Sequence, residues 1–134
     1  MEILLIEDSV IQALIISELL KDNNSQYNLT ILNDGEKAIN YLFRKGLYKN
    51  VPLPDIVILD LNLPKVNGFD ILSEIQKHEE LRNVKVVILT SSEDEDDKSR
   101  ARQLGALEYF IKPFVFTEYQ QIIDQIVVAA RQRG

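Results

Sequence analysis

The chain has 134 residues, the usual length of one domain and too short for two hydrophobic cores of ordinary size. Its formal net charge of −6 argues against a nucleic-acid-binding body, because such binding depends on Lys and Arg neutralising phosphates. It contains no cysteine, which excludes disulfides and thiolate metal sites and fits a reducing compartment.

The apolar stretch at residues 1–20 is not expected to be a signal peptide. Glu7 and Asp8 interrupt it, and no basic residue precedes its apolar part. No uninterrupted apolar run approaches the ~18 to 20 residues that are needed to cross a bilayer. We therefore expect a cytoplasmic protein that contacts no membrane.

Five short apolar runs predict β-strands. They cover residues 3–6, 29–32, 56–59, 84–89 and 107–111. Runs of this length, rich in Ile, Val and Leu and without alternation, are typical of strands that are buried on both faces. Strands of that kind belong to a parallel sheet covered by helices.

Helical patterns lie between these runs and after the last of them. They cover residues 10–21, 36–44, 68–77, 94–104 and 117–131. Ser9 and Gln12 have the spacing of a capping box, and Gly105 stands where a helix C-terminal glycine is expected. The last helix carries an i, i+3, i+4, i+7 apolar stripe, formed by Tyr119, Ile122, Ile123, Ile126, Val127 and Ala130.

Five successive strand–helix units predict a single α/β domain over residues 1–134. The expected architecture is a five-stranded parallel sheet with helices on both faces, a flavodoxin-like (βα)5 fold with right-handed crossovers. The last helix ends a few residues before the end of the sequence, so we expect no output domain.

Polar residues follow four of the predicted strands at their carboxyl ends. They are Glu7 and Asp8, Asp60, Thr90 and Ser91, and Lys112. Ligands of parallel α/β sheets bind at this edge, so these side chains are expected to share one rim.

Three carboxylates at one rim repel each other, at about 3 kcal/mol per pair for a separation of ~5 Å and an effective dielectric of ~20. Such a site takes up protons or binds a hard cation, and Mg²⁺ suits oxygen ligands beside a phosphate. We therefore expect Asp60 to act as the nucleophile of aspartyl-phosphate chemistry, with Mg²⁺ and Lys112 neutralising the transferred group. The Thr90 hydroxyl would donate to a phosphoryl oxygen, and the small Ser91 would leave room for it.

This constellation resembles the receiver domains of two-component response regulators, over essentially the whole chain. The resemblance implies that a sensor histidine kinase phosphorylates Asp60. It also implies that Glu7, Asp8, Asp60 and the backbone carbonyl of Asn62 bind the metal, with Asp8 preferred over Glu7 as a direct ligand. It further implies two roles on residues that match the family's pattern, Thr90 as the switch hydroxyl and Tyr109 as the aromatic that swings inward on activation. By the same resemblance, the peptide bond between Lys112 and Pro113 is expected to be cis.

A narrower similarity is carried by residues 54–65, by the long connection at residues 44–53 that precedes them, and by Thr90-Ser91-Ser92 with its acidic continuation. These segments are similar to the single-domain regulators paired with phytochrome-type sensor kinases. The acidic pair is Glu-Asp rather than Asp-Asp, a departure that leaves the metal chemistry intact.

Three other functions stay open at this stage. A phosphatase or phosphotransferase of the haloacid dehalogenase class needs a second Asp two residues after its nucleophile, where this chain has Asn62. A nucleotide or flavin binder needs a Gly-rich cradle, where this chain has Glu7 and Asp8. A receiver-like module that binds partners without phosphorylation is the third alternative, and the presence of all the chemical residues speaks against it.

Surplus apolar side chains predict an association face. Val128 and Ala129 fall outside the core stripe of the last helix, and Phe114 and Phe116 lie just before it. Surplus of this kind can mark a contact between molecules, so we expect a homodimer through the last helix and the fifth strand. The acidic run at residues 93–97 is instead expected to be a solvated helix start whose charge complements the helix dipole.

Overall fold

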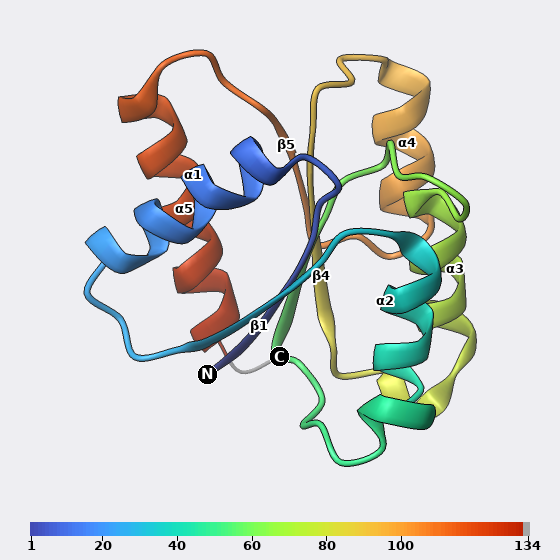
Figure 1. The fold of residues 1–134 in the computed structure, drawn as a ribbon. Coiled ribbons are helices and arrows are strands. Elements are labelled where there is room, and N and C mark those ends of the chain that lie inside the picture. Colours follow the sequence, from blue (N-terminus) through green and yellow to red (C-terminus); the bar gives the residue numbers. More distant parts are fainter. Residues whose placement is uncertain (133–134) are drawn as a thin grey trace.

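The computed structural model describes residues 1–132 and confirms the expected five-stranded parallel sheet (Figure 1). The strands are β1 (Glu2–Ile6), β2 (Asn28–Leu32), β3 (Ile56–Leu59), β4 (Lys85–Thr90) and β5 (Glu108–Ile111). Their order in the sheet is β2-β1-β3-β4-β5, so the chain reverses its direction of travel between β1 and β3. In a sheet of this order, ligands bind outside the carboxyl ends of the strands at that reversal.

The helices cover both faces of the sheet, also as expected. They are α1 (Val10–Asp22), α2 (Gly35–Leu42), α3 (Gly68–Lys77), α4 (Glu95–Gln103) and α5 (Phe116–Arg131), with short 3₁₀ turns at η1 (Gly46–Tyr48) and η2 (Glu79–Leu81). Figure 1 shows α1 and α5 together on one face, and α2, α3 and α4 on the other. None of the helices in this described part combines the length and the apolar character that crossing a bilayer requires.

One hydrophobic cluster lies on each side of the sheet, because successive residues of a strand point to opposite faces. Leu4 and Val57 belong to the cluster under α2, α3 and α4, whereas Leu5 and Ile58 belong to the one under α1 and α5. The central strands β1, β3 and β4 are buried almost throughout, which fixes the positions of the residues that follow them.

The prediction that all five strands are buried on both faces is wrong for β2 and β5. Both strands carry exposed and half-buried residues. Each lies at an edge of the sheet and has a single neighbouring strand, so helices cover it less completely.

The expected cis bond between Lys112 and Pro113 is also wrong for this structure. The described residues 1–132 contain no cis peptide bond. The trans form of an X–Pro bond is lower in free energy by about 0.5–1 kcal/mol.

Candidate functional site

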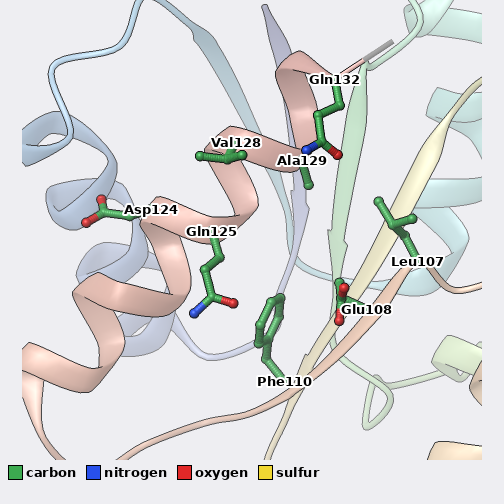
Figure 2. A pocket seen from close by; sticks show the side chains of 8 residues that line it. All are labelled: Leu107, Glu108, Phe110, Asp124, Gln125, Val128, Ala129 and Gln132. Carbon is green, nitrogen blue, oxygen red and sulfur yellow. The ribbon is translucent and has the colours of Figure 1, made fainter. Parts of the chain in front are cut away.

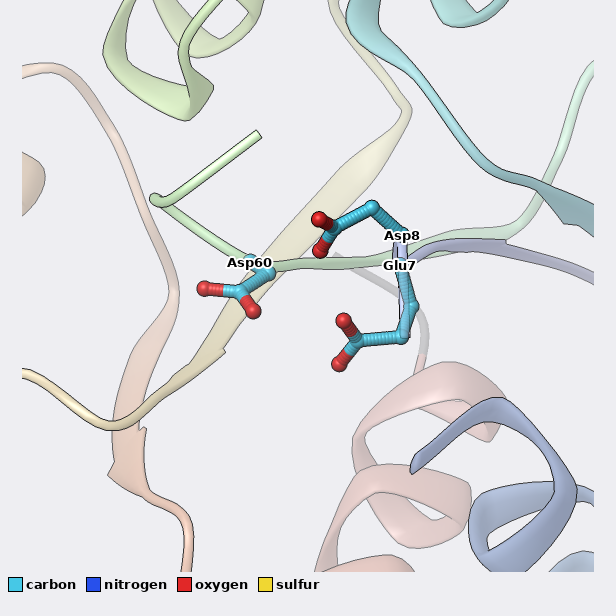
Figure 3. A group of neighbouring side chains, drawn as sticks. All are labelled: Glu7, Asp8 and Asp60. Atoms are coloured by element: carbon cyan, nitrogen blue, oxygen red, sulfur yellow. The ribbon is translucent and has the colours of Figure 1, made fainter. Parts of the chain in front are cut away.

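Three carboxylates meet at the carboxyl ends of β1 and β3. Glu7 and Asp8 directly follow β1, and Asp60 directly follows β3. Each offers one oxygen, and these three oxygens lie within 4.8 Å of one another (Figure 3). Glu7 and Asp60 are buried, whereas Asp8 is exposed. The predicted convergence of acidic side chains at the rim is therefore present.

Lys112 brings a positive charge to the same place. Its Nζ lies 2.6 Å from Oε1 of Glu7 and 2.8 Å from Oδ2 of Asp60. Its backbone N–H donates to the carbonyl of Thr90 at 2.7 Å, which continues the β4–β5 pairing by one residue beyond Ile111. The sheet itself therefore positions this lysine at the rim.

The remaining contacts of Asp60 hold its carboxylate in one orientation. Its Oδ1 accepts a hydrogen bond from the backbone N–H of Asn62 at 3.1 Å, while Oδ2 accepts from Lys112. Its own N–H donates to the carbonyl of Ile6 at 3.2 Å, so the β1–β3 pairing extends to Asp60. Both oxygens are thus oriented before any ligand arrives.

The pKa values of Glu7 and Lys112 are both shifted by their surroundings. Burial raises the pKa of Glu7 above its usual value, and the hydrogen bond and positive charge of Lys112 oppose this shift only in part. For Lys112, burial acts to lower the pKa, but the hydrogen bonds that its ammonium donates to Asp60 and Glu7, together with their negative charges, outweigh burial and the pKa is raised. Lys112 therefore remains a cation at neutral pH.

A cavity of about 400 Å³ opens over these groups. It is lined by Glu7, Asp8, Ser9, Gln12, Asp60, Asn62, Ser91, Glu93, Ile111, Lys112, Pro113 and Phe114. Of the residues expected at the site, Glu7, Asp8, Asp60, Asn62, Ser91 and Lys112 line this cavity. Thr90 and Tyr109 do not.

Thr90 and Tyr109 lie beside the cavity and are linked to each other through Ser92. Thr90 is fully buried at the end of β4, and its hydroxyl oxygen lies 3.5 Å from the N–H of Ser92. The Tyr109 hydroxyl donates to the carbonyl of Ser92 at 3.0 Å. Burial raises the pKa of Tyr109, with Asp97 and Asp94 adding to the shift, so this phenol stays a donor.

A contact between Gln12, which lines the cavity, and Tyr119 was not anticipated from the sequence. The first half of the expected capping box is present, because Ser9 Oγ accepts from the N–H of Gln12 at 3.2 Å. The reciprocal bond is absent in the described residues: the Gln12 side chain accepts instead from the Tyr119 hydroxyl at 2.7 Å, and Glu7 accepts from the Ser9 N–H. Tyr119 matched the core stripe of its helix, so the sequence held no signal for this contact.

The titration of Tyr119 provides one test of this part of the structure. Burial raises the pKa of Tyr119 to about 12, whereas an unfolded tyrosine ionises near 10. The unfolded state therefore loses its proton first, and the stability that this group contributes is present below about pH 10 and is lost as the pH rises toward about 12. Over that interval the free energy of unfolding of the wild type should fall by roughly 2 kcal/mol more than that of Tyr119→Phe, measured by denaturant titration. Equal losses in the two proteins would contradict this.

Gly68, at the start of α3, provides a second test. A Cβ at this position would lie 2.6 Å from the carbonyl oxygen of Asp60 and 2.7 Å from Cα of Leu61. Backbone atoms cannot yield as a side chain can, so Gly68→Ala should displace the loop that carries Asp60 and lower the free energy of unfolding by about 1–3 kcal/mol. The matched variant Gly46→Ala meets no atom within 4 Å but has a positive φ, so it reports backbone strain alone. Stability is measured by thermal unfolding. If Gly68→Ala lost less stability than Gly46→Ala, the close approach of Gly68 to the backbone of Asp60 and Leu61 would be unimportant.

Comparison with known proteins identifies relatives of this chain. A family model described as the response regulator receiver domain matches residues 3–124. Response regulator Rcp1 of Synechocystis sp. is 40% identical over 110 residues, which are 82% of this chain and 75% of that protein. The probable methanogenesis regulatory protein FilR2 of Methanothrix harundinacea is 37% identical over 125 residues, or 92% of this chain and 79% of that protein.

Solved structures of similar proteins share the fold. The Mn²⁺-bound form of response regulator Rcp1 superposes with a TM-score of 0.91 at 34% identity, covering 99% of this chain and 96% of that one. The phosphorylated cyanobacterial phytochrome response regulator RcpA has a TM-score of 0.88 at 34% identity, covering 93% and 89%. The five-stranded arrangement and its helices are therefore those of these regulators.

Proposed function

This chain belongs to the response regulator receiver domain family, and from that membership we propose that it accepts a phosphoryl group on Asp60 from a sensor histidine kinase and signals by protein contact. One observation carries the proposal. The buried carboxylate of Asp60 lies beside two further carboxylates and within 2.8 Å of the Lys112 ammonium, at the mouth of an open cavity. Few side-chain arrangements supply a nucleophile, metal ligands and a phosphate-binding cation together.

The transfer step follows from this arrangement. A carboxylate oxygen of Asp60 forms a bond to phosphorus while the P–N bond to the kinase histidine breaks, and the nitrogen keeps the electron pair. With acetyl phosphate the P–O bond to the acetyl group breaks instead, and acetate leaves. Lys112 stays protonated throughout and offers a compact positive charge to the phosphoryl oxygens.

The residues at the rim fit a divalent metal ion. Glu7, Asp8 and Asp60 against Lys112 leave a formal excess of negative charge, and carboxylate oxygens with the backbone carbonyl of Asn62 are the ligands that Mg²⁺ prefers. When bound, Mg²⁺ would supply further neutralisation of the charge on the phosphoryl oxygens. The Mn²⁺-bound form of Rcp1 supports this part of the proposal.

Thr90 and Tyr109 would convert phosphorylation into a change of shape. The hydroxyl of Thr90 would turn to donate to a phosphoryl oxygen on Asp60, and the ring of Tyr109 would then move toward the space it leaves. Tyr109 is held by Ser92, in the loop before α4, so that loop would move with it. A phosphoryl group shifts this equilibrium only as far as it prefers one of the two states.

A phytochrome-type kinase is the sensor that the relatives support. RcpA is a phytochrome response regulator by its own description, and it covers most of this chain. We carry this pairing to the present protein as part of the proposal, together with a site of action in the cytoplasm.

We also propose that α5 and β5 form the interface of a homodimer. Between them lies a hollow of about 360 Å³, lined by Leu107, Glu108, Phe110, Asp124, Gln125, Val128, Ala129 and Gln132 (Figure 2). β5 is an edge strand with one neighbour, and Val128 is 57% exposed, so a second copy could cover both. Light scattering at high concentration should show a dimer that Val128→Asp weakens; a monomer in both phosphorylation states would overturn the interface.

A phosphate mimic tests the proposed function directly. Mg²⁺ together with beryllofluoride should raise the melting temperature by several degrees, because ligands that bind only the folded state stabilise it. The chain has no tryptophan, so the transition is best followed by circular dichroism or calorimetry. No shift with the mimic, combined with no gain in mass after incubation with acetyl phosphate, would favour a module that works without phosphorylation.

A further inference from the structure

The buried hydroxyl of Tyr119 has no part in the chemistry described so far. Tyr119 lies in the first turn of α5 and is only 4% exposed. Its hydroxyl donates to Oε1 of Gln12 across the contact between α1 and α5, at 2.7 Å. Gln12 lines the same cavity as Asp60 and Lys112.

This hydrogen bond determines which end of the Gln12 amide faces away from α5. Because Oε1 accepts the Tyr119 proton, the two N–H groups of Nε2 are the part left to donate. Within residues 1–132, the contact with Tyr119 is the one hydrogen bond that the Gln12 side chain makes. Gln12 is half-buried and lines the cavity, so part of its side chain is accessible from there.

The electrostatic surroundings of Tyr119 agree with its position beside the site. Burial is the main cause of its raised pKa, and the charges of Lys112, Glu7 and Asp60 all act on it. The phenol therefore keeps its proton at neutral pH and remains a donor to Gln12. An arrangement that served only to pack α5 would not require its polar end to point at a cavity-lining amide.

We infer that Gln12 is a further binding residue of the site: its Nε2 donates a hydrogen bond to the phosphoryl group of the phosphodonor, and Tyr119 positions the amide for that contact. The inference rests on the proposed phosphorylation of Asp60 and adds a substrate contact to it. A neutral amide adds a donor to the phosphoryl oxygens without placing another charge beside Lys112. Gln12 is the binding group, and Tyr119 acts only through it.

The test compares Gln12→Leu, Tyr119→Phe and the double variant. Gln12→Leu keeps most of the side-chain volume and removes the donor, so the initial rate of Asp60 labelling by phosphoramidate should fall about tenfold. Tyr119→Phe removes one hydroxyl and should slow labelling about threefold. The double variant should be no slower than Gln12→Leu, because Tyr119 has nothing to position once the amide is gone.

A binding measurement separates this role from a purely structural one. The affinity for beryllofluoride should fall about tenfold in Gln12→Leu, whereas the affinity for Mg²⁺ alone, by calorimetry, should not change. Gln121→Leu, on the exposed side of α5, is the matched control and should behave as wild type in both assays. Should Gln12→Leu prove unstable, Gln12→Ala serves in its place.

The outcomes distinguish the two proposals. If the wild type is not labelled on Asp60 at all, the proposed function fails. If the wild type is labelled and Gln12→Leu is labelled at the same rate, the role of Gln12 is overturned while the proposed function stands. Independent, multiplicative losses in the double variant would overturn the positioning role of Tyr119.

Discussion

Asp60→Asn should abolish incorporation of phosphoryl groups from acetyl phosphate or phosphoramidate in the presence of Mg²⁺. The substitution keeps the size and shape of the side chain, and its amide oxygen can still accept from the N–H of Asn62 or from Lys112. It removes the negative charge that makes a carboxylate oxygen nucleophilic. The loss is therefore expected in the chemical step, with the fold retained.

The measurement is intact mass after incubation with the donor, with circular dichroism to verify folding. Asp70→Asn is the matched control, because Asp70 is exposed in the first turn of α3 and lies outside the cavity. It should be labelled like the wild type. Undiminished labelling of Asp60→Asn would place the phosphoryl group on another residue, and the assignment of the nucleophile would then be wrong.

Local sequence patterns sufficed to predict the sheet and its helices. The strand prediction for residues 56–59 and the helix prediction for residues 68–77 coincide with β3 and α3. Both segments have strong apolar patterns, and Asn67 caps α3 by accepting from the N–H of Asp70. The short turns η1 and η2 have no such pattern and were not anticipated.

The convergence of the site was also predictable, for a topological reason. Glu7, Asp60 and Lys112 lie far apart in sequence, but each follows a strand, and parallel strands end at one edge. Sequence position after a strand is thus enough to place such residues at one edge of the sheet. The strand order then determines which of them lie side by side.

Contacts between helices could not be predicted from these local sequence patterns. Gln12 and Tyr119 lie 107 positions apart, and their hydrogen bond depends on how α1 and α5 pack against each other. Tyr119 follows the apolar stripe of α5, so its polar end gave no separate signal. The wrong expectation that β2 and β5 are buried on both faces has a similar origin. Edge strands differ from central strands in the number of neighbouring strands rather than in amino-acid composition, so the sequence did not distinguish them.

Lys112→Met should lower the stability of the fold and slow phosphorylation, but it should raise the affinity for Mg²⁺. Lys112 shares its ammonium between Glu7 and Asp60, at 2.6 Å and 2.8 Å. Without it, two buried carboxylates lose their partner, and breaking a buried ion pair by removing one member is strongly destabilising. In the absence of divalent ions, the free energy of unfolding should fall by about 3 kcal/mol.

Loss of the Lys112 charge should also increase the affinity of the rim for a divalent ion. The rim then carries three carboxylates with no opposing cation, so calorimetry should show tighter Mg²⁺ binding than in the wild type. Labelling by acetyl phosphate should nevertheless fall at least tenfold, roughly the effect of losing one charge-assisted contact to the phosphoryl oxygens.

Lys77→Met is the matched control for these measurements. Lys77 pairs with Glu74 on the exposed surface of α3, at 3.7 Å, and exposed pairs contribute little to stability. It should leave stability, metal affinity and labelling unchanged. Lys112→Met is informative because Mg²⁺ affinity should rise while labelling falls. General damage to the fold would instead lower both. If Mg²⁺ affinity and labelling fell together, Lys112 would act by holding the rim in shape rather than by its charge.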